Sequence, residues 1–191
     1  MALSLDKVDA AVLAMWSMPP FFTLQPVIAT RQKQLSMWVD IVLAYLEQNR
    51  LNCIPVQNPS GGSNGINIFH NQTIDRRLSY EGIVAVLEAI VSGGHGIWRD
   101  KNARDAVVVS GSLTISDIAG LIHNWARDSN LVNEICTVYE LREGDATHGQ
   151  AFHGLDAMII VEAARILERS GKVSLLEASS SDEIGIKFCT A

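Results

Sequence analysis

The chain has 191 residues, enough for one large domain or two small ones. Hydrophobic residues make up 48% and charged residues 19%, a core-forming composition that excludes a wholly disordered chain. The formal net charge of −6 argues against a protein that binds nucleic acid through a general excess of positive charge. Three scattered cysteines fit a reducing compartment, and we expect a cytoplasmic protein without a signal peptide or transmembrane segment.

The first half of the chain contains patterns for two long helices. Apolar residues at helical spacing follow Thr30, which is a suitable N-cap, and continue to Leu46. A second helix is predicted over residues 79–93, where the pair Gly93-Gly94 ends the pattern.

The connections in this half are predicted from composition and alternation. Residues 58–65 are rich in glycine, serine and asparagine and are predicted to form a loop. A short helix is then expected around residues 68–77. A β-hairpin follows the second long helix, with strands at 97–98 and 106–109.

The second half repeats this order. Apolar residues from Ile115 to Ala126 form one helical stripe, with Thr114 as the predicted N-cap. Another helix is predicted to begin at Asp156 and to end at Gly171, and a hairpin closes the chain. Helix, short helix, helix and hairpin is the order of a winged helix. We therefore predict an α+β fold of two tandem winged-helix domains, with an N-terminal segment at 1–29 and domains at 30–111 and 112–191.

The distribution of charged residues helps to distinguish nucleic-acid binding from protein binding as the use of this fold. The predicted helix at 79–93 carries Glu81 and Glu88 but no Lys or Arg, so it could not neutralise a run of phosphates. Up to Gly111 the chain has 9 basic and 9 acidic residues, and beyond it 6 and 12. The acidity of the second half indicates either a solubilising surface or a docking surface for a basic segment. A DNA-binding transcriptional regulator is the alternative function, although the charge disfavours it.

No residues form a recognisable catalytic or metal-binding motif. His148 and His153 are five residues apart, which fits neither one helical turn nor a zinc-finger pattern. Cys136 lies among apolar neighbours, as a buried thiol does. We expect a protein that is not an enzyme, with no catalytic residue, cofactor or metal.

The most informative segment is Pro19-Pro20-Phe21-Phe22. Two consecutive prolines favour a stiff extended backbone that has little entropy to lose on binding. The two aromatic rings that follow could pack on their own domain or dock into another subunit. We expect this segment to project apolar anchors toward a partner.

Two stretches of sequence resemble a known family. The run at 19–26 is followed by Thr30-Arg31-Gln32-Lys33-Gln34-Leu35 and Trp38, and together they resemble the start of the vacuolar protein-sorting-associated protein 25 family. This family supplies the small subunit of the endosomal sorting complex ESCRT-II. The second half resembles it through Trp125, residues 137–141, Gly144-Asp145 and residues 152–155.

The resemblance implies a fold and a role. It implies two tandem winged helices in a Y-shaped heterotetramer, with two copies of this subunit attached to two larger winged-helix subunits. It assigns that attachment to Pro19, Pro20, Phe21 and Phe22. It also implies that the second domain recruits and activates the first ESCRT-III subunit, in sorting of ubiquitinated cargo into multivesicular bodies. The protein would then reach the endosomal membrane only through the complex.

Overall fold

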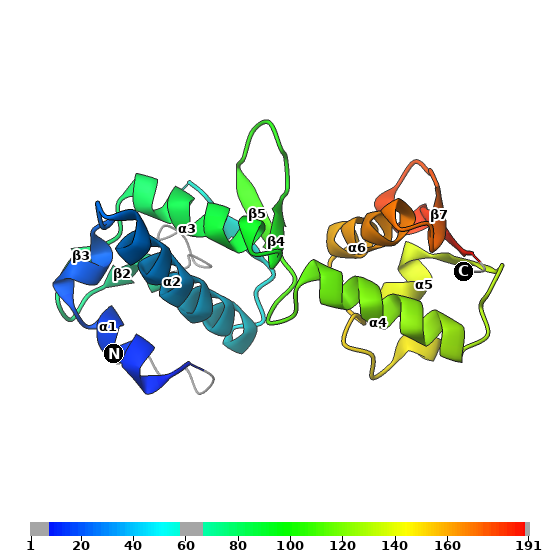
Figure 1. The fold of residues 1–191 in the computed structure, drawn as a ribbon, viewed down its shortest axis with the longest axis horizontal. Helices are drawn as coiled ribbons and strands as arrows, with labels where there is room; N and C mark the ends of the chain where they lie inside the picture. Colours follow the sequence, from blue (N-terminus) through cyan, green and yellow to red (C-terminus); the bar gives the residue numbers. More distant parts are fainter. Residues whose placement is uncertain (1–7, 58–66, 190–191) are drawn as a thin grey trace. The chain divides into compact units, whose positions relative to one another are not determined.

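The computed structural model describes residues 8–57 and 67–189 and divides into two compact units, Met1–Ser112 and Leu113–Ala191 (Figure 1). The predicted loop at 58–65 and residues 1–7 of the predicted N-terminal segment lie outside the described residues. Each unit combines helices with its own three-stranded antiparallel sheet, so the fold is α+β, as predicted. In the described part of the chain, no helix is both long and apolar enough to span a bilayer.

Unit 1 is built on two packed helices, α2 (Ile28–Gln48) and α3 (Tyr80–Ser92), which lie side by side in Figure 1. Its three-stranded sheet has the order β1-β5-β4. The remaining elements of the unit are α1 (Ala10–Trp16), η1 (Pro19–Phe22), β1 (Cys53–Pro55), η2 (Asn67–Phe69), β2 (His70–Asn71), β3 (Arg76–Arg77), β4 (Gly96–Trp98) and β5 (Ala106–Val109).

The long helices and the hairpin of unit 1 are confirmed. Helix α3 has Ser79 as its N-cap, and the Ser79 hydroxyl accepts a hydrogen bond from the Gly82 amide. Helix α2 begins three residues earlier than a Thr30 N-cap predicts, because Val27 occupies the N-cap.

The short helix predicted over 68–77 is wrong. The chain forms a 3-10 turn and then a two-stranded hairpin, in which His70 pairs with Arg77. The Asn71 side chain donates to the carbonyl of Trp16 and accepts from the Thr73 amide, so it holds a turn where a helix would need regular backbone bonds. Asp75 has a φ of 48°, which also interrupts a right-handed helix.

Unit 2 has the sheet order β6-β8-β7, with helix α4 packed against helix α6. Thr114 caps α4 in a reciprocal capping box with Asp117, and Asp156 caps α6, as predicted. Its elements are α4 (Ile115–Asp128), β6 (Ile135–Thr137), α5 (Val138–Glu143), η3 (Asp145–Thr147), α6 (Ala157–Arg169), β7 (Val173–Leu176), η4 (Ser181–Glu183) and β8 (Gly185–Phe188).

The sequence patterns missed the first strand of each sheet. Strand β1 pairs with β5 and strand β6 pairs with β8, each over three residues. Three residues are too few to establish an alternating pattern, and each pairing joins residues far apart in the chain.

Candidate functional site

The Pro19–Phe22 segment is a 3-10 helix and not the extended strand predicted from its prolines. The φ angle that proline imposes suits both conformations, so the two prolines do not decide between them. The turn is closed by hydrogen bonds from the Phe21 amide to the Met18 carbonyl and from the Thr23 amide to the Pro20 carbonyl.

Both phenylalanine rings are buried in unit 1, at 2% exposure for Phe21 and 3% for Phe22. Phe21 stacks on Trp38 with ring centroids 4.7 Å apart, and Phe22 meets Trp38 edge-on at 5.4 Å. Trp16 of α1 closes the cluster against Phe22 at 6.1 Å. The expectation that these rings project outward is therefore wrong for this chain, because α1 and α2 supply aromatic partners for both of them.

The Gln34 side chain of α2 forms hydrogen bonds that fix the backbone of the Pro19–Phe22 segment and of the residues after it. Gln34 is 3% exposed, and its side-chain amide donates to the carbonyls of Phe21 and Thr23, both at 2.9 Å. Its amide oxygen accepts from the Gln25 amide at 3.1 Å, and the Trp38 indole also donates to Phe21. A buried amide with this many partners holds the segment in one position.

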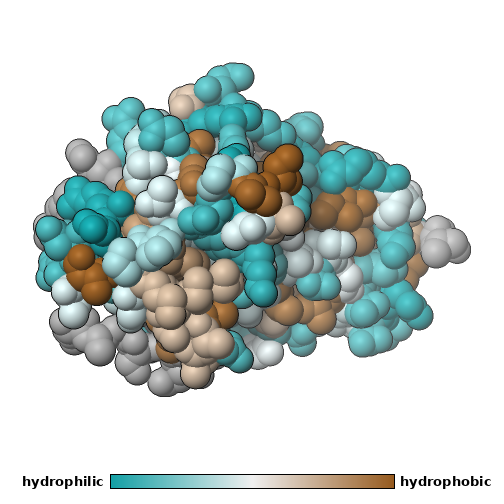
Figure 2. All heavy atoms as spheres, turned by 60° about the vertical axis from the view of Figure 1, so that its left-hand side comes forward, coloured by the Kyte–Doolittle hydropathy of each residue, from teal (hydrophilic) through white to brown (hydrophobic). Residues whose placement is uncertain are grey.

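The outer face of the segment is exposed. Met18 is 48% exposed, and Pro19 and Pro20 also lie at the surface. A groove of about 600 Å³ runs beside Pro20, and its apolar lining comes from α1, η1 and α2: Ala11, Val12, Met15, Pro20, Phe21 and Met37. Figure 2 brings this side of unit 1 forward and shows apolar residues gathered in patches among hydrophilic ones.

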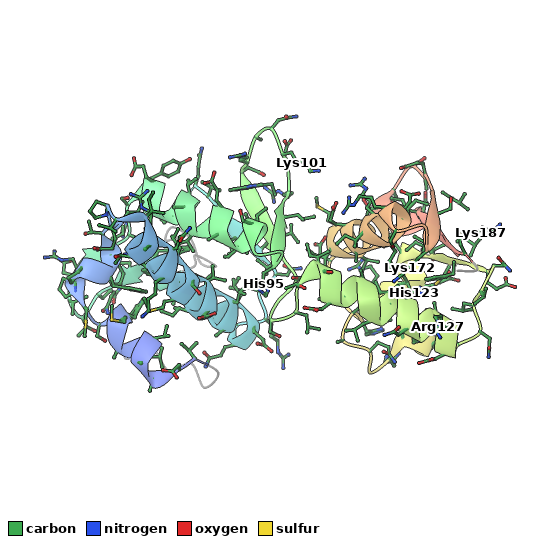
Figure 3. The ribbon with its side chains drawn as sticks, viewed as in Figure 1. His95, Lys101, His123, Arg127, Lys172 and Lys187 are labelled. Atoms are coloured by element: carbon green, nitrogen blue, oxygen red, sulfur yellow. The ribbon has the colours of Figure 1, made fainter. Side chains whose placement is uncertain are left out.

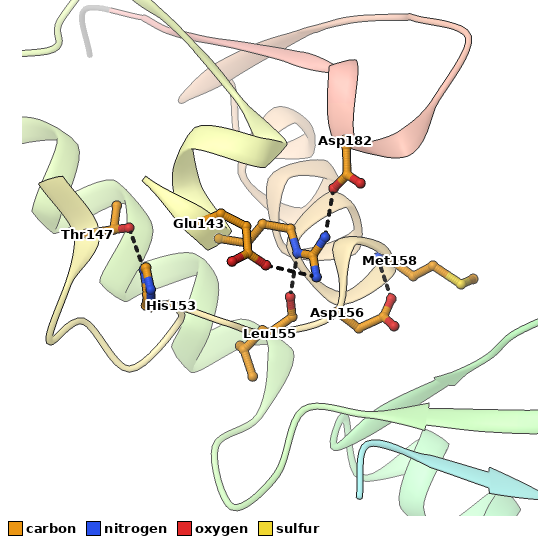
Figure 4. Close-up of polar contacts among 8 residues, drawn as sticks. Glu143, Thr147, His153, Leu155, Asp156, Met158 and Asp182 are labelled. Atoms are coloured by element: carbon orange, nitrogen blue, oxygen red, sulfur yellow. Dashed lines mark hydrogen bonds and ion pairs between the residues drawn. The ribbon is translucent and has the colours of Figure 1, made fainter. Parts of the chain in front are cut away.

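Much of the acidic charge of unit 2 has internal partners. Arg142 donates to the carbonyl of Leu155 at 3.0 Å and forms ion pairs with Asp182 at 3.1 Å and Glu143 at 3.3 Å (Figure 4). Asp156 caps α6 by accepting from the Met158 amide. Four carboxylates have no partner among the described residues: Asp128, Glu134, Glu177 and Glu183.

The side chains of unit 2 that are candidates for catalysis or metal binding are Cys136, His148 and His153, and each has structural contacts within the unit. Burial raises the pKa of the Cys136 thiol to about 12, which disfavours the thiolate that a nucleophile requires. The His153 ring bonds to the Thr147 hydroxyl at 2.8 Å and lies 4.5 Å from the His148 ring. Within residues 8–57 and 67–189, no three His, Cys, Asp or Glu side chains are grouped to hold a metal ion.

A family model described as "ESCRT-II complex subunit" matches residues 15–156. Vacuolar protein sorting-associated protein 25 of Arabidopsis thaliana is 35% identical over 170 residues, which cover 89% of this chain and 90% of that protein. A crystal structure of subunit VPS25 of ESCRT-II matches with a TM-score of 0.73 at 24% identity, and covers 95% of this chain and 98% of that one. The crystal structure of the complex (VPS22/VPS25/VPS36) contains a chain that matches with a TM-score of 0.72 at 26% identity, over 94% of this chain and 100% of that one.

These similarities define a class of protein, the subunits of an endosomal trafficking complex, which are not enzymes. The chain belongs to the ESCRT-II complex subunit family and, within it, to the vacuolar protein sorting-associated protein 25 family. Membership of this family favours the role of an ESCRT-II subunit over that of a DNA-binding transcriptional regulator.

Proposed function

We propose that this chain is the small subunit of an ESCRT-II complex and attaches to two larger subunits through the Pro19–Phe22 segment. Each unit would be one winged-helix domain, and two copies of the chain would join one copy of each larger partner. The solved complex with VPS22 and VPS36 provides the precedent for these partners. The observation that carries the proposal is the exposed face of Pro19 and Pro20, which buried aromatic rings hold in place.

The two halves of the motif have different tasks in this proposal. Phe21 and Phe22 form the base that gives the segment its shape, because both rings pack inside unit 1. Pro19, Pro20 and Met18 form the contact surface, since these side chains are open to a partner. Rigid apolar groups lose little conformational entropy when they dock, so a small surface of this kind can anchor a subunit.

Unit 2 is proposed to recruit and activate the first ESCRT-III subunit. Its carboxylates Asp128, Glu134, Glu177 and Glu183, which lack partners among the described residues, would attract a basic segment. The protein would work in the cytoplasm and reach the endosomal membrane through its complex, where the pathway sorts ubiquitinated cargo.

The attachment is tested with the surface variant Pro19→Ala/Pro20→Ala. We expect copurification with the two larger subunits to fall at least roughly tenfold, because rigid apolar contacts at an interface centre carry a large share of its affinity. Pro26→Ala is the matched control, since Pro26 is also exposed but lies outside the motif.

Thermal unfolding of each variant separates lost binding from lost folding. Both variants should remain folded, because neither changes a buried side chain. A small decrease in melting temperature is expected, since each lost proline gives the unfolded chain more freedom. Normal assembly of the double variant would show that the complex attaches elsewhere. The change of Phe21 and Phe22 to Ala cannot serve as this test, because it would empty the core of unit 1.

A further inference from the structure

Unit 2 has twice as many acidic residues as Lys and Arg residues, yet an arginine, a lysine and a histidine gather at one place. His123 and Arg127 lie four residues apart on α4, a spacing that places two side chains on the same helical face. Lys172, which follows α6, lies beside them in Figure 3. These three residues are called the basic cluster below.

Regular backbone structure positions the basic cluster. Gly171 has a φ of 72° and ends α6, and the Lys172 amide bonds back to the Leu167 carbonyl at 3.0 Å. The Lys172 carbonyl in turn accepts from the Cys189 amide at 2.9 Å. Arg127 stands in the last turn of α4, which packs against α6. The Cα positions of the cluster are thus set by two helix ends and a strand, and no long loop is involved.

The charges of the cluster are not neutralised by any residue that the structure describes. Among the described residues, neither Arg127 nor Lys172 has an ion pair or a side-chain hydrogen bond, whereas Arg142, Arg165 and Arg169 are each paired with a carboxylate. The carbonyl groups at the end of a helix attract a cation, which explains Arg127 at the end of α4 and Lys172 after the end of α6 separately. This attraction does not explain why both cations lie beside the same histidine, His123.

The pKa of His123 reflects its burial and the two positive charges beside it. Burial is the main cause that lowers the pKa of its imidazole, and the positive charges of Lys172 and Arg127 lower it further. Its Nδ1 atom is buried and has no partner in the described part of the chain. An anion beside the ring would reverse the electrostatic contribution and favour the protonated form.

We propose that the basic cluster binds one phosphate monoester, carried by a phosphorylated side chain of a partner protein. A phosphate monoester carries a charge near −2 and three acceptor oxygens. The Arg127 guanidinium offers two parallel donors to such a group, and the Lys172 ammonium adds a mobile point charge. Protonated His123 would supply a third positive charge.

The charge of the surrounding unit argues for a single phosphate group and against an extended polyanion. Nucleic acid and an anionic membrane surface both require positive charge over a wide area, and unit 2 has an excess of acidic residues. A phosphorylated side chain needs only the local charge of the three clustered residues. This site is independent of the proposed attachment through Pro19 and Pro20.

The test measures binding to the full chain by NMR, with resonances observed for the His123 ring and for the amides of Arg127 and Lys172. The probes are inorganic phosphate and a short Gly-Ser peptide with one phosphoserine, each compared with chloride at equal ionic strength. We expect saturable shifts with both probes, no shifts with the unphosphorylated peptide, and a higher His123 pKa in the presence of the phosphopeptide.

Variants locate the binding. Arg127→Gln and Lys172→Gln should each weaken phosphopeptide binding roughly tenfold or more, as expected for loss of one charge-assisted hydrogen bond. Arg165→Gln is the matched control, because it removes one positive charge from the same unit at a residue already paired with Glu162. All three residues are exposed at the surface, so the variants should fold.

Three results would overturn the proposal. Equal shifts in chloride and phosphate would mean simple ionic screening, and equal loss of affinity in Arg165→Gln would mean that only net charge matters. Binding to phosphatidylcholine vesicles with 20% phosphatidylserine, without binding to the phosphopeptide, would assign the cluster to a membrane.

Discussion

Gln34 shows how much depends on one polar side chain at the residue scale. Its side chain joins α2 to the backbone of the Pro19–Phe22 segment and of the residues that follow it, through three hydrogen bonds with Phe21, Thr23 and Gln25. Trp38, one turn further along α2, provides both the ring on which Phe21 stacks and a fourth bond. The shape of the proposed contact surface therefore depends on residues that are hidden from the partner.

We predict that Gln34→Met lowers the free energy of unfolding by about 1–3 kcal/mol, the usual cost of leaving buried polar groups without partners. Methionine fills a similar volume but cannot bond to the Thr23 carbonyl or the Gln25 amide. Urea unfolding followed by tryptophan fluorescence measures the change. Gln32→Met is the control, because Gln32 is exposed on the same helix. Equal effects of the two substitutions would contradict this role for Gln34.

At the scale of elements, the helix ends show a common backbone pattern. Helices α2, α3, α4 and α6 each end with a residue of positive φ and a bond from the next amide back into the last turn. The residues of positive φ are Arg50, Gly94, Asn130 and Gly171. Glycine made two of these ends visible in the sequence, whereas Arg50 carries no such signal.

Arg50 adopts a φ of 54°, a conformation that costs an ordinary L-residue about 1–2 kcal/mol relative to glycine. We predict that Arg50→Gly stabilises unit 1 by roughly 1 kcal/mol, less any loss from greater freedom of the unfolded chain. Thermal unfolding measures the effect. Asn130→Gly should give a smaller gain, because asparagine tolerates this conformation better than arginine. A lower melting temperature for Arg50→Gly would contradict the prediction.

The start of α5 links stability to pH. The Thr137 amide, 2.7 Å from a Glu140 carboxylate oxygen, and then the Thr137 hydroxyl lower the pKa of Glu140 below its usual value of 4.5. Because the folded pKa is depressed, the contribution to stability is complete above about pH 4.5 and is lost as the pH falls through the folded value.

We predict that Glu140→Gln costs about 1 kcal/mol at pH 7, the typical value of a helix cap, and clearly less near pH 3. Urea unfolding at the two pH values measures both quantities. Glu134→Gln is the control, because the Glu134 carboxylate has no bond to a described residue and its removal should cost little at either pH. A cost for Glu140→Gln that does not change with pH would show that the charge of Glu140 has no part in the cap.

At the scale of the whole molecule, the chain consists of two units that each have helices, a sheet and buried apolar residues. We predict that residues 113–191 produced alone fold cooperatively, because their helices and strands pair within the unit. Circular dichroism during thermal unfolding tests this. A broad transition without a pre-transition baseline would show that unit 2 depends on unit 1.

Local patterns in the sequence were sufficient for much of this architecture. The α+β class, the cap at Thr114, the helix starts near Ser79 and Asp156, and both hairpins follow from spacing, capping residues and glycine positions. Each of these signals acts through contacts between residues close together in the chain, so it can be read from the local sequence. The family resemblance was also visible in the sequence, and comparison with known proteins confirmed the family.

Other features depended on residues that meet only in the folded chain. Nothing near Phe21 indicates that Trp38 and Trp16 would bury the two rings and leave Pro19 and Pro20 as the exposed face. Likewise, the spacing of His123 and Arg127 in the sequence places them on one helix face. Lys172 lies close to them only because α4 packs against α6. The sequence by itself determined the long helices, the hairpin after each second helix and the family, because these depend on short-range order. The tertiary structure decided which side chains are available to a partner, because burial depends on contacts between distant residues.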